Sequence, residues 1–517
     1  MEGRILRISL DDETISQEHV EDACVESLYE EVDEHTFVIV FPGSAGTIAL
    51  YMNRQSGRFS RDASQSTLAV KMNALGIVAV VVSGSAHRLS YLYASDDDIS
   101  IYHCENIRFS SPHRFFQLLA SDPSDGCMSI GEAGEKGGAL GACLLDSSMC
   151  IGRGGLAAMM GSMNFKGIIA HTASSVRPDG SSFWPHSRTA KSFSLYGSAS
   201  LVDCGMRNGW LPTRYFSGLY DPRCVYLDGR MACRTYNADH VSCPMCTIAC
   251  RLEESGEALA DWAEAMALGS NMGIFSLEKV NPLRRACISR GLDPVDTGEV
   301  LSYLKTLEHV PYTLVDVRNA DVGELERVIS LIASRKGNGE ALSAGLCALD
   351  GALSVEGRSC IYDFRGCHGQ ALFSSLGENT PCHVDLVKGL HRILDDETIG
   401  RVVAYLRLFT HAMENSGLPP FFMLPMHFDQ VPFTVMRLPM VMRRIMSSFA
   451  RKCPAPLSAG LESVDAFDRL HGPAEKIPDR FMLPASVGYT DELNMVRLFM
   501  GYQDEMQYIR RKVASGR

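Results

Sequence analysis

Three cysteines lie close together near the middle of the chain, as Cys243, Cys246 and Cys250, with two and then three residues between them. If the chain turns helically after Cys246, the sulfurs can approach one small volume, and thiolates packed that closely require a cation between them. The spacing therefore predicts a metal or iron–sulfur site. The alternative is three unreactive cysteines in a buried helix, but Pro244 indicates a loop.

The spacing also distinguishes between kinds of metal site. A structural zinc site would need a fourth Cys or His nearby, whereas the next cysteine, Cys287, is distant and falls in an apolar helical stretch. A radical enzyme that uses S-adenosylmethionine has the two intervals in the reverse order. A cubane cluster whose fourth ligand comes from a distant part of the chain fits the spacing best.

Composition limits the class of protein. A chain of 517 residues can form two to four domains. We expect no signal peptide, because residues 1–4 lead directly into an alternating strand pattern, and the 17 cysteines then indicate a reducing cytoplasm rather than a disulfide framework. No apolar run reaches the roughly 18–20 residues of a membrane span. A net charge of -12 argues against a nucleic-acid partner.

The first 172 residues predict a β-rich domain. Short runs of β-branched and aromatic residues are bounded by Gly, Ser or Asp, as is typical of strands. Ser110 or Ser111 is a suitable N-cap for a following helix. The predicted strands are residues 4–10, 36–40, 77–82, 89–93 and 99–103, and the predicted helix is 112–120.

A glycine-rich stretch, residues 152–155, precedes an amphipathic segment. Glycine allows close approach of the backbone to a ligand, and a glycine-rich loop that enters a helix presents free N–H groups to phosphate. A tight turn before a helix is the alternative for this stretch taken alone.

Helical periodicity dominates after Cys250. We expect N-caps at Asp296 and Asp321. The pattern indicates an α+β protein in which a helical domain carrying the cysteines (173–345) and a C-terminal helical domain (346–517) follow the β-rich domain (1–172). The predicted helices are 258–268, 298–307, 322–334, 397–416 and 435–450.

Several motifs resemble, in order, those of the aldehyde ferredoxin oxidoreductase family, and by this resemblance we identify the chain as a divergent member. Ordered matches along most of the chain are more specific than any single motif. They are residues 130–135, 152–166 and 211–216, the cysteine triplet, residues 267–271, 291–293 with Thr297 and Gly298, 362–366, and Cys382 with His383.

The resemblance implies a fold and a set of cofactors. In the family a β-structured domain forms a base for two pterins that hold tungsten or molybdenum, and two helical domains cover them. A [4Fe-4S] cluster passes electrons to ferredoxin or to an iron–sulfur partner subunit. Mg²⁺ at the pterin phosphates, a small carbonyl substrate and a homo-oligomer are further expectations of the same kind.

The resemblance also assigns candidate site residues. Cys243, Cys246 and Cys250 would hold the cluster. His383 and an acid, Asp261 or alternatively Glu264, would be catalytic, although the residue type of His383 taken alone favours an interior histidine. The candidates for pterin contact are Gly152, Arg153, Gly154, Gly155, Gly291, Leu292, Asp293, Arg365, Glu414, Gly417 and Leu418, and a surface ion pair is an equal alternative for Arg365.

The chain departs from the family at several positions. Pro419 stands where the family has the fourth cluster cysteine. The cluster would then take its fourth ligand from Cys453, Cys367 or Cys347, use a non-cysteine ligand, keep three protein ligands, or be absent. Residues 21–35 replace one glycine-rich loop of the family, and residues 63–66 replace its Asn-Ser-Gly-Gly segment.

Two functions follow from these matches and departures. The first is an active tungsten- or molybdenum-pterin oxidoreductase that oxidises an aldehyde or a related carbonyl compound. The second is a non-catalytic paralogue that acts as a scaffold or electron-transfer subunit of a larger redox complex. The sequence favours neither metal, because pterin sulfurs would bind both.

Overall fold

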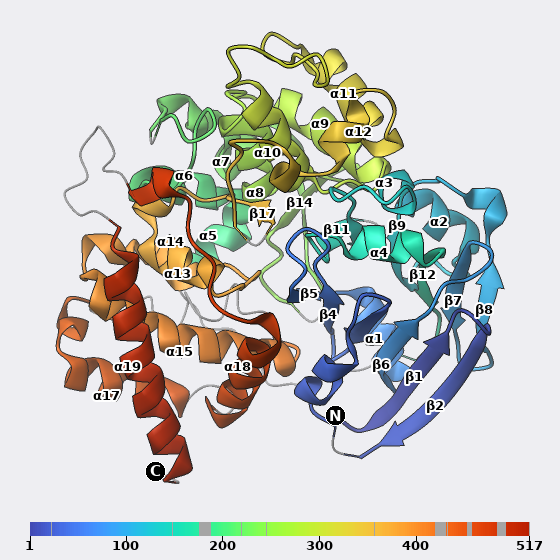
Figure 1. Ribbon diagram of the computed structural model, residues 1–517, viewed down its shortest axis with the longest axis horizontal. Helices are drawn as coiled ribbons and strands as arrows, with labels where there is room; N and C mark the ends of the chain where they lie inside the picture. The colour runs from blue at the N-terminus through green and yellow to red at the C-terminus, as the bar shows by residue number, and fades with distance from the viewer. Residues whose placement is uncertain are drawn as a thin grey trace.

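The computed structural model describes residues 1–21, 23–146, 148–174, 188–218, 220–244, 246–355, 357–418, 431, 433–451, 457–482 and 493–515. A β-rich N-terminal part lies beside a larger part that consists mostly of helices (Figure 1). The predicted α+β class is therefore confirmed. The domain limits at residues 172 and 345 remain predictions.

Two six-stranded sheets form the N-terminal part. The first has the order β2-β1-β6-β3-β4-β5, and the second has the order β11-β10-β9-β12-β7-β8. In each sheet one pair is parallel, β1 with β6 and β7 with β12, and the other pairs are antiparallel. The strands are β1 (Gly3–Ser9), β2 (Thr14–Val20), β3 (Thr36–Val40), β4 (Gly46–Met52), β5 (Phe59–Gln65), β6 (Ile77–Ser83), β7 (Ser90–Ala94), β8 (Ile99–His103), β9 (Gly126–Ile130), β10 (Cys143–Leu145), β11 (Met149–Ile151) and β12 (Phe165–Ala170).

The alternating strand patterns are explained by a core that both sheets share. Leu6 and Ile8 of β1 lie in the same buried cluster as Ile168 of β12, whereas Ile5 packs in a second cluster on the other face of the first sheet. Each predicted strand in this part coincides with an observed strand to within one or two residues. Its helices are α1 (Thr67–Ala74), α2 (Pro112–Leu119), α3 (Glu132–Glu135) and α4 (Leu156–Ser162).

Helix α2 shows why the predicted cap works. The Ser111 hydroxyl accepts a hydrogen bond from the Arg114 N–H at 3.1 Å, and Pro112 occupies the first helical position. The cap is therefore Ser111 and not Ser110.

The rest of the chain is mostly helical, with two small sheets. The helices are α5 (Arg188–Tyr196), α6 (Leu201–Asn208), α7 (Gly229–Thr235), α8 (Trp262–Ala265), α9 (Leu277–Ser289), α10 (Pro294–Leu304), α11 (Val322–Ser334), α12 (Gly339–Ser343), α13 (His368–Ser375), α14 (His383–Lys388), α15 (Asp396–Asn415), α17 (Pro439–Ala450), α18 (Leu457–His471) and α19 (Met495–Ala514). The strands are β13 (Asp239–Val241), β14 (Arg251–Glu254), β15 (Glu257–Ala258), β16 (Ser354–Val355) and β17 (Arg358–Ser359).

Three helix predictions differ from the structure. Asp321 caps α11 as predicted, but the N-cap of α10 is Asp293, three residues before the expected Asp296, so Asp296 lies in the first turn. Residues 258–268 contain the end of β15, the short helix α8 and part of a π-helical turn, η5 (Met266–Ser270), rather than one helix. Residues 435–450 divide between the 3₁₀ turn η9 (Phe433–Arg437) and α17.

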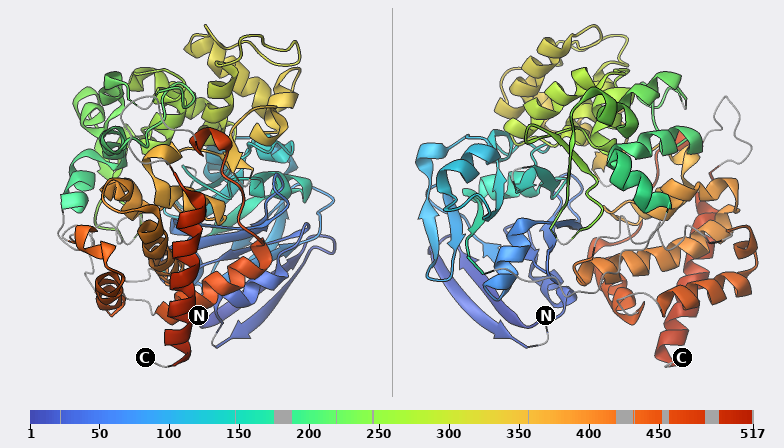
Figure 2. Two further views of the ribbon diagram at one scale, coloured as in Figure 1. Left: turned by 60° about the vertical axis from the view of Figure 1, so that its left-hand side comes forward. Right: turned by 180° about the vertical axis from the view of Figure 1, so that it is seen from behind.

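The C-terminal helices pack against the first sheet. Phe467 of α18 lies over Phe59 of β5, with ring centroids 5.8 Å apart, and the Tyr29 hydroxyl is 3.1 Å from the Ser463 hydroxyl. Figure 2 shows the same arrangement from two further directions. Within the described ranges, no helix combines the length and the apolar character that crossing a membrane requires.

Candidate functional site

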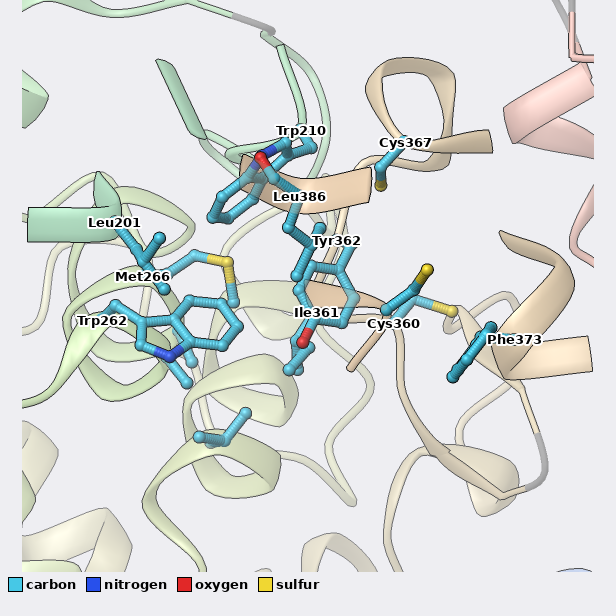
Figure 3. Packing of buried hydrophobic residues seen from close by; sticks show 14 of the residues in the cluster. Leu201, Trp210, Trp262, Met266, Cys360, Ile361, Tyr362, Cys367, Phe373 and Leu386 are labelled. Atoms are coloured by element: carbon cyan, nitrogen blue, oxygen red, sulfur yellow. The ribbon is translucent and has the colours of Figure 1, made fainter. Parts of the chain in front are cut away.

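A cavity of about 410 Å³ lies where the two parts of the chain meet. One wall comes from strands β4 and β5, and the opposite wall comes from the cysteine segment, α8, α14 and α15. Trp262 of α8 is part of the lining and stacks on Tyr362, with ring centroids 5.6 Å apart. Figure 3 shows Trp210 packed beside this pair, so a buried aromatic cluster supports the cavity from behind.

The cysteine segment forms the loop of a β-hairpin. Strands β13 and β14 pair antiparallel, and the loop between them carries the three cysteines. The Cys246 N–H donates to the Cys243 carbonyl at 3.1 Å, Ala249 has a φ of 54°, and Cys250 leads directly into β14. The condition of a helical turn after Cys246 is not met, because residues 246–250 form an irregular loop with Ala249 in the left-handed region and β14 begins at Arg251.

All three cysteines nevertheless line the cavity. Burial raises the pKa of each thiol, and the pKa of Cys250 is raised further by the proximity of Cys243 and Cys246. Within the described part of the chain, no three Cys, His, Asp or Glu side chains form a group that could hold one metal ion. A cubane cluster binds each thiolate through a different iron atom, so its ligands stand further apart than those of a single ion. The hairpin loop therefore presents three thiolates to the cavity, as a cluster would require.

The candidates for a fourth ligand lie elsewhere. Cys367 is buried, does not line the cavity, and its thiol is 3.3 Å from the Asp363 carbonyl oxygen, whereas Cys347 is exposed. Cys453 and Pro419 lie outside the described residues. Cys150, the middle residue of β11, does line the cavity, although it was not among the predicted fourth ligands. Its place two residues before the glycine-rich stretch was the available signal.

The structure brings His383 and both candidate acids to the cavity. Burial lowers the pKa of His383 to about 3, so its imidazole is neutral at pH 7. Asp261 is the N-cap of α8 and accepts from the N–H groups of Ala263 and Glu264 at 2.8 and 2.9 Å. Asp261 is accessible to solvent from the cavity. The surrounding protein nevertheless desolvates its carboxyl, and this desolvation raises its pKa.

Glu264 has a raised pKa although it pairs with a guanidinium. Its carboxylate lies 2.7 Å from the Arg284 Nε, yet burial raises the pKa to about 7 against the opposing effect of Arg284. Glu264 can therefore exchange a proton at neutral pH.

The glycine-rich stretch turns the chain, and Arg153 is its contribution to the cavity lining. Gly152, Gly154 and Gly155 have φ values of +77°, +97° and +127°, which L side chains rarely adopt. A Cβ at Gly154 would lie 2.5 Å from the Asn53 side chain, and a Cβ at Gly155 would lie 3.0 Å from Arg54. Gly154 and Gly155 therefore pack against the end of the β4–β5 hairpin.

In the second predicted pterin motif, residues 291–293, a single residue likewise lines the cavity while the others pack within the protein. Gly291 packs on the backbone of Gly131, and Leu292 is buried, whereas Asp293 lines the cavity. The carboxylate of Asp293 caps α10 and lies 3.3 Å from the Arg153 Nε. An arginine and an aspartate from separate motifs thus meet at the edge of the cavity.

The C-terminal candidates divide into two groups. Glu414 and Leu418 line the cavity, and Glu414 forms a buried ion pair with Arg61. Gly417 packs against the Pro42 carbonyl instead. Arg365 pairs with Asp363 at 2.6 Å and donates to the Phe216 carbonyl, so it forms an ion pair that is largely buried and not the surface pair of the alternative.

The lining combines apolar side chains with charged groups of both signs. Its volume falls in the roughly 300–1,000 Å³ range of small-molecule sites. Apolar side chains, among them Ile48, Leu252 and Trp262, form much of the wall, and the guanidiniums of Arg153, Arg251 and Arg284 contribute positive charge. Five carboxylates, those of Asp62, Asp261, Glu264, Asp293 and Glu414, line the same cavity, and Arg153 and Arg284 pair with two of them. Guanidinium groups can bind phosphate and thiolates can hold an iron–sulfur cluster, so the donor set is compatible with both groups.

Family models match most of the chain. The model of the aldehyde ferredoxin oxidoreductase N-terminal domain matches residues 38–172, and the model of domains 2 and 3 of the same family matches residues 180–434.

Individual proteins are similar at low identity. The tungsten-containing aldehyde ferredoxin oxidoreductase of Pyrococcus furiosus is 27% identical over 349 residues, which are 60% of this chain and 57% of that protein. Its counterpart in Pyrococcus horikoshii is 24% identical over 450 residues, 74% of each chain. The WOR-like subunit of an aliphatic sulfonate oxidoreductase from Pyrococcus furiosus is 22% identical over 323 residues, 54% of this chain and 51% of that subunit.

One solved structure has the same fold over nearly the whole chain. The active-site complex BamBC of benzoyl coenzyme A reductase, solved with 1,5-dienoyl-CoA, superimposes with a TM-score of 0.64 and covers 99% of this chain and 98% of that chain. The sequence identity is 12%, so the likeness concerns the fold alone.

Proposed function

We propose that this chain, which belongs to the aldehyde ferredoxin oxidoreductase family, is a tungsten- or molybdenum-pterin oxidoreductase with a [4Fe-4S] cluster. It oxidises an aldehyde or a related carbonyl compound and passes the electrons to ferredoxin or to a partner subunit. The observation that carries this proposal is one cavity, between the β-rich and helical parts, lined together by Cys243, Cys246, Cys250, His383 and Glu264.

The chain's own residues would have separate tasks. The bound metal and cluster supply redox chemistry, which the side chains lack. The three cysteines hold the cluster, and Arg153 and Arg284 face the phosphate groups. His383, which is neutral at pH 7, orients a carbonyl or water at a ring nitrogen. Glu264, with a pKa of about 7, accepts or releases a proton at its carboxylate.

A partner subunit is part of the proposal. One relative is named as a subunit of an aliphatic sulfonate oxidoreductase, and the solved structure with this fold is a complex of two components. All three cysteines of the hairpin are only partly buried. A cluster held there would therefore lie near the surface, where it could pass electrons to a partner.

The decisive experiment is elemental analysis of protein produced and purified without oxygen in medium that contains tungstate and molybdate. We expect about one tungsten or molybdenum atom per chain together with iron. Cys246→Ser should lose the iron and the broad visible absorption of the cluster, whereas Cys347→Ser, at an exposed position outside the cavity, should retain both. Iron in Cys246→Ser equal to that of the wild type would remove the hairpin from the cluster site.

A second function has its own support. The segment Ala63 to Gln65 lines the cavity where the family has Asn-Ser-Gly-Gly, so side chains stand where a glycine backbone would approach a cofactor closely. Iron without tungsten or molybdenum in the same analysis would establish an electron-transfer or scaffold subunit instead of an enzyme.

A further inference from the structure

Helix α10 carries a row of buried carboxylates that begins at the cavity. Asp293 is its N-cap, and Asp296 and Glu299 follow at intervals of three residues, so each is a neighbour of the next on the helix surface. Their exposed fractions are 2%, 2% and 1%. Asp293 lines the cavity, and Asp296 and Glu299 do not, so the row extends from the cavity into the protein interior.

The groups that face this row supply little positive charge. The Arg153 Nε lies 3.3 Å from Asp293 and 3.8 Å from Asp296. Neutral donors complete the contacts: the Ser359 hydroxyl donates to Asp296 at 2.6 Å, and the Asn271 amide donates to both oxygens of Glu299 at 2.7 and 2.8 Å. Tyr215 and Cys360 also lie near Glu299, and burial raises the pKa of both, so they are uncharged at neutral pH.

Close packing holds the inner end of the row in place. At Gly298 a Cβ would lie 2.8 Å from the carbonyl carbon of Ala267, so glycine allows α10 to contact the backbone of η5. This contact brings Asn271, the residue after η5, against Glu299. π-helical turns occur frequently at functional sites.

Three buried carboxylates that share one guanidinium cannot all be ionised at low cost. A carboxyl in that position reduces its charge by binding a proton. Burial, with the added charge of Asp293, raises the pKa of Asp296 to about 6, and burial raises the pKa of Glu299 to about 8. At neutral pH Glu299 therefore holds a proton, and Asp296 is the next site to take one.

We propose that Asp296 and Glu299 form a proton store behind Asp293 that exchanges protons with the redox cavity. The proposal rests on the proposed function, because oxidation of an aldehyde with one water gives the acid, two electrons and two protons. The electrons leave to the iron–sulfur carrier, which is the oxidant. Of the two protons, one passes through Asp293 to a carboxylate oxygen of Asp296, and the other is taken up by the Glu264 carboxylate at the cavity. Asp296 and Glu299 are positioning residues, because neither touches the cavity.

The store can be tested on cofactor-free protein by infrared spectroscopy, which separates the C=O stretch of a protonated carboxyl from that of a carboxylate. We expect a protonated-carboxyl band that titrates near pH 8 in the wild type and is absent from Glu299→Gln. Asp296→Asn should remove a band that titrates near pH 6. Glu308→Gln, at an exposed carboxylate, is the matched control and should leave both bands, with circular dichroism showing that each variant is folded. A band near pH 8 that survives in folded Glu299→Gln overturns the proposal.

Coupling to the cavity needs a second measurement on protein loaded with its cluster. The reduction potential of wild-type protein should depend on pH between about 6 and 8, and Glu299→Gln should weaken this dependence without loss of iron. An identical pH dependence in both proteins would reject the coupling. If the protein binds no cluster or tungsten, the proposed function fails, while the infrared titration still decides whether the store exists.

Discussion

At the scale of single residues, burial leaves His383 and Glu299 uncharged at neutral pH by shifting their pKa values in opposite directions. Desolvation penalises the charged form, which is the protonated form of histidine and the deprotonated form of glutamate. The pKa of His383 therefore falls to about 3, and that of Glu299 rises to about 8. A basic and an acidic side chain are therefore both neutral in an interior where an unpaired charge is costly.

His383 should make the protein sensitive to mild acid. Between pH 6.5 and 3 the unfolded chain binds a proton at this histidine that the folded chain does not bind, so the free energy of unfolding falls as the pH is lowered. Its contribution should amount to about 2 kcal/mol between pH 7 and pH 5. Urea denaturation of His383→Gln at both pH values should show a smaller decrease than the wild type. The exposed histidine in His309→Gln is the control, and an equal decrease in His383→Gln would contradict the prediction.

At the scale of elements, glycines decide how closely segments approach one another around the site. Gly298 sets the contact of α10 with η5, and Gly417 sets the contact between the end of α15 and the Pro42 carbonyl. Neither contact is visible in helical periodicity, because the partner segment is distant in the sequence. The glycines of residues 152–155 similarly fix a turn against a hairpin and leave Arg153 to face the cavity.

Gly298→Ala should therefore destabilise the protein even though alanine favours helix. The new Cβ would overlap the backbone at Ala267, and we expect a cost of about 1–3 kcal/mol in the free energy of unfolding. Gly323→Ala is a matched control on α11, where a Cβ would meet only an Asp321 oxygen at 3.5 Å. That variant should be neutral or slightly stabilising. Thermal unfolding of the two variants compares them directly, and equal melting temperatures would refute the packing argument.

At the scale of the whole molecule, buried polar contacts join the β-rich part to the C-terminal helices beside the cavity. Arg61 of β5 pairs with Glu414 of α15, and Tyr29 meets Ser463 of α18. Ser463 is in turn 3.0 Å from the Nδ1 of His411, and the Nε2 of His411 is 3.0 Å from Glu378. Burial would raise the pKa of Glu378, but His411 and Arg407 together hold it well below its usual range.

The Arg61–Glu414 pair should be essential to this junction. Arg61→Met leaves a buried carboxylate without its partner and should lower the free energy of unfolding by about 3–5 kcal/mol. Adding Glu414→Gln should restore part of the loss, because no unpaired charge then remains. Urea denaturation of the single and double variants measures both effects. A double variant less stable than Arg61→Met would show that the pair acts through something other than its charge.

Local sequence patterns determined much of the architecture. Alternation located the strands of the N-terminal sheets, and Asp321 with the periodicity after it gave the bounds of α11. The architectural features depend on short-range rules: strand and helix periods and capping by a side chain three residues away. The family resemblance, and not local pattern, assigned His383 and the acids at 261 and 264 to the site of the cysteine triplet, and all of these residues line one cavity.

Only the tertiary structure decided the features that arise from contacts between distant segments. Residues 247–250 form an irregular loop before β14 instead of the helical turn considered after Cys246, and the Asp293 cap displaced the one expected at Asp296. The chain order gave no sign that Asn271 would meet Glu299. Burial and the approach of another segment set which side chain faces the cavity and which carboxyl keeps its proton, and both are properties of the packed fold.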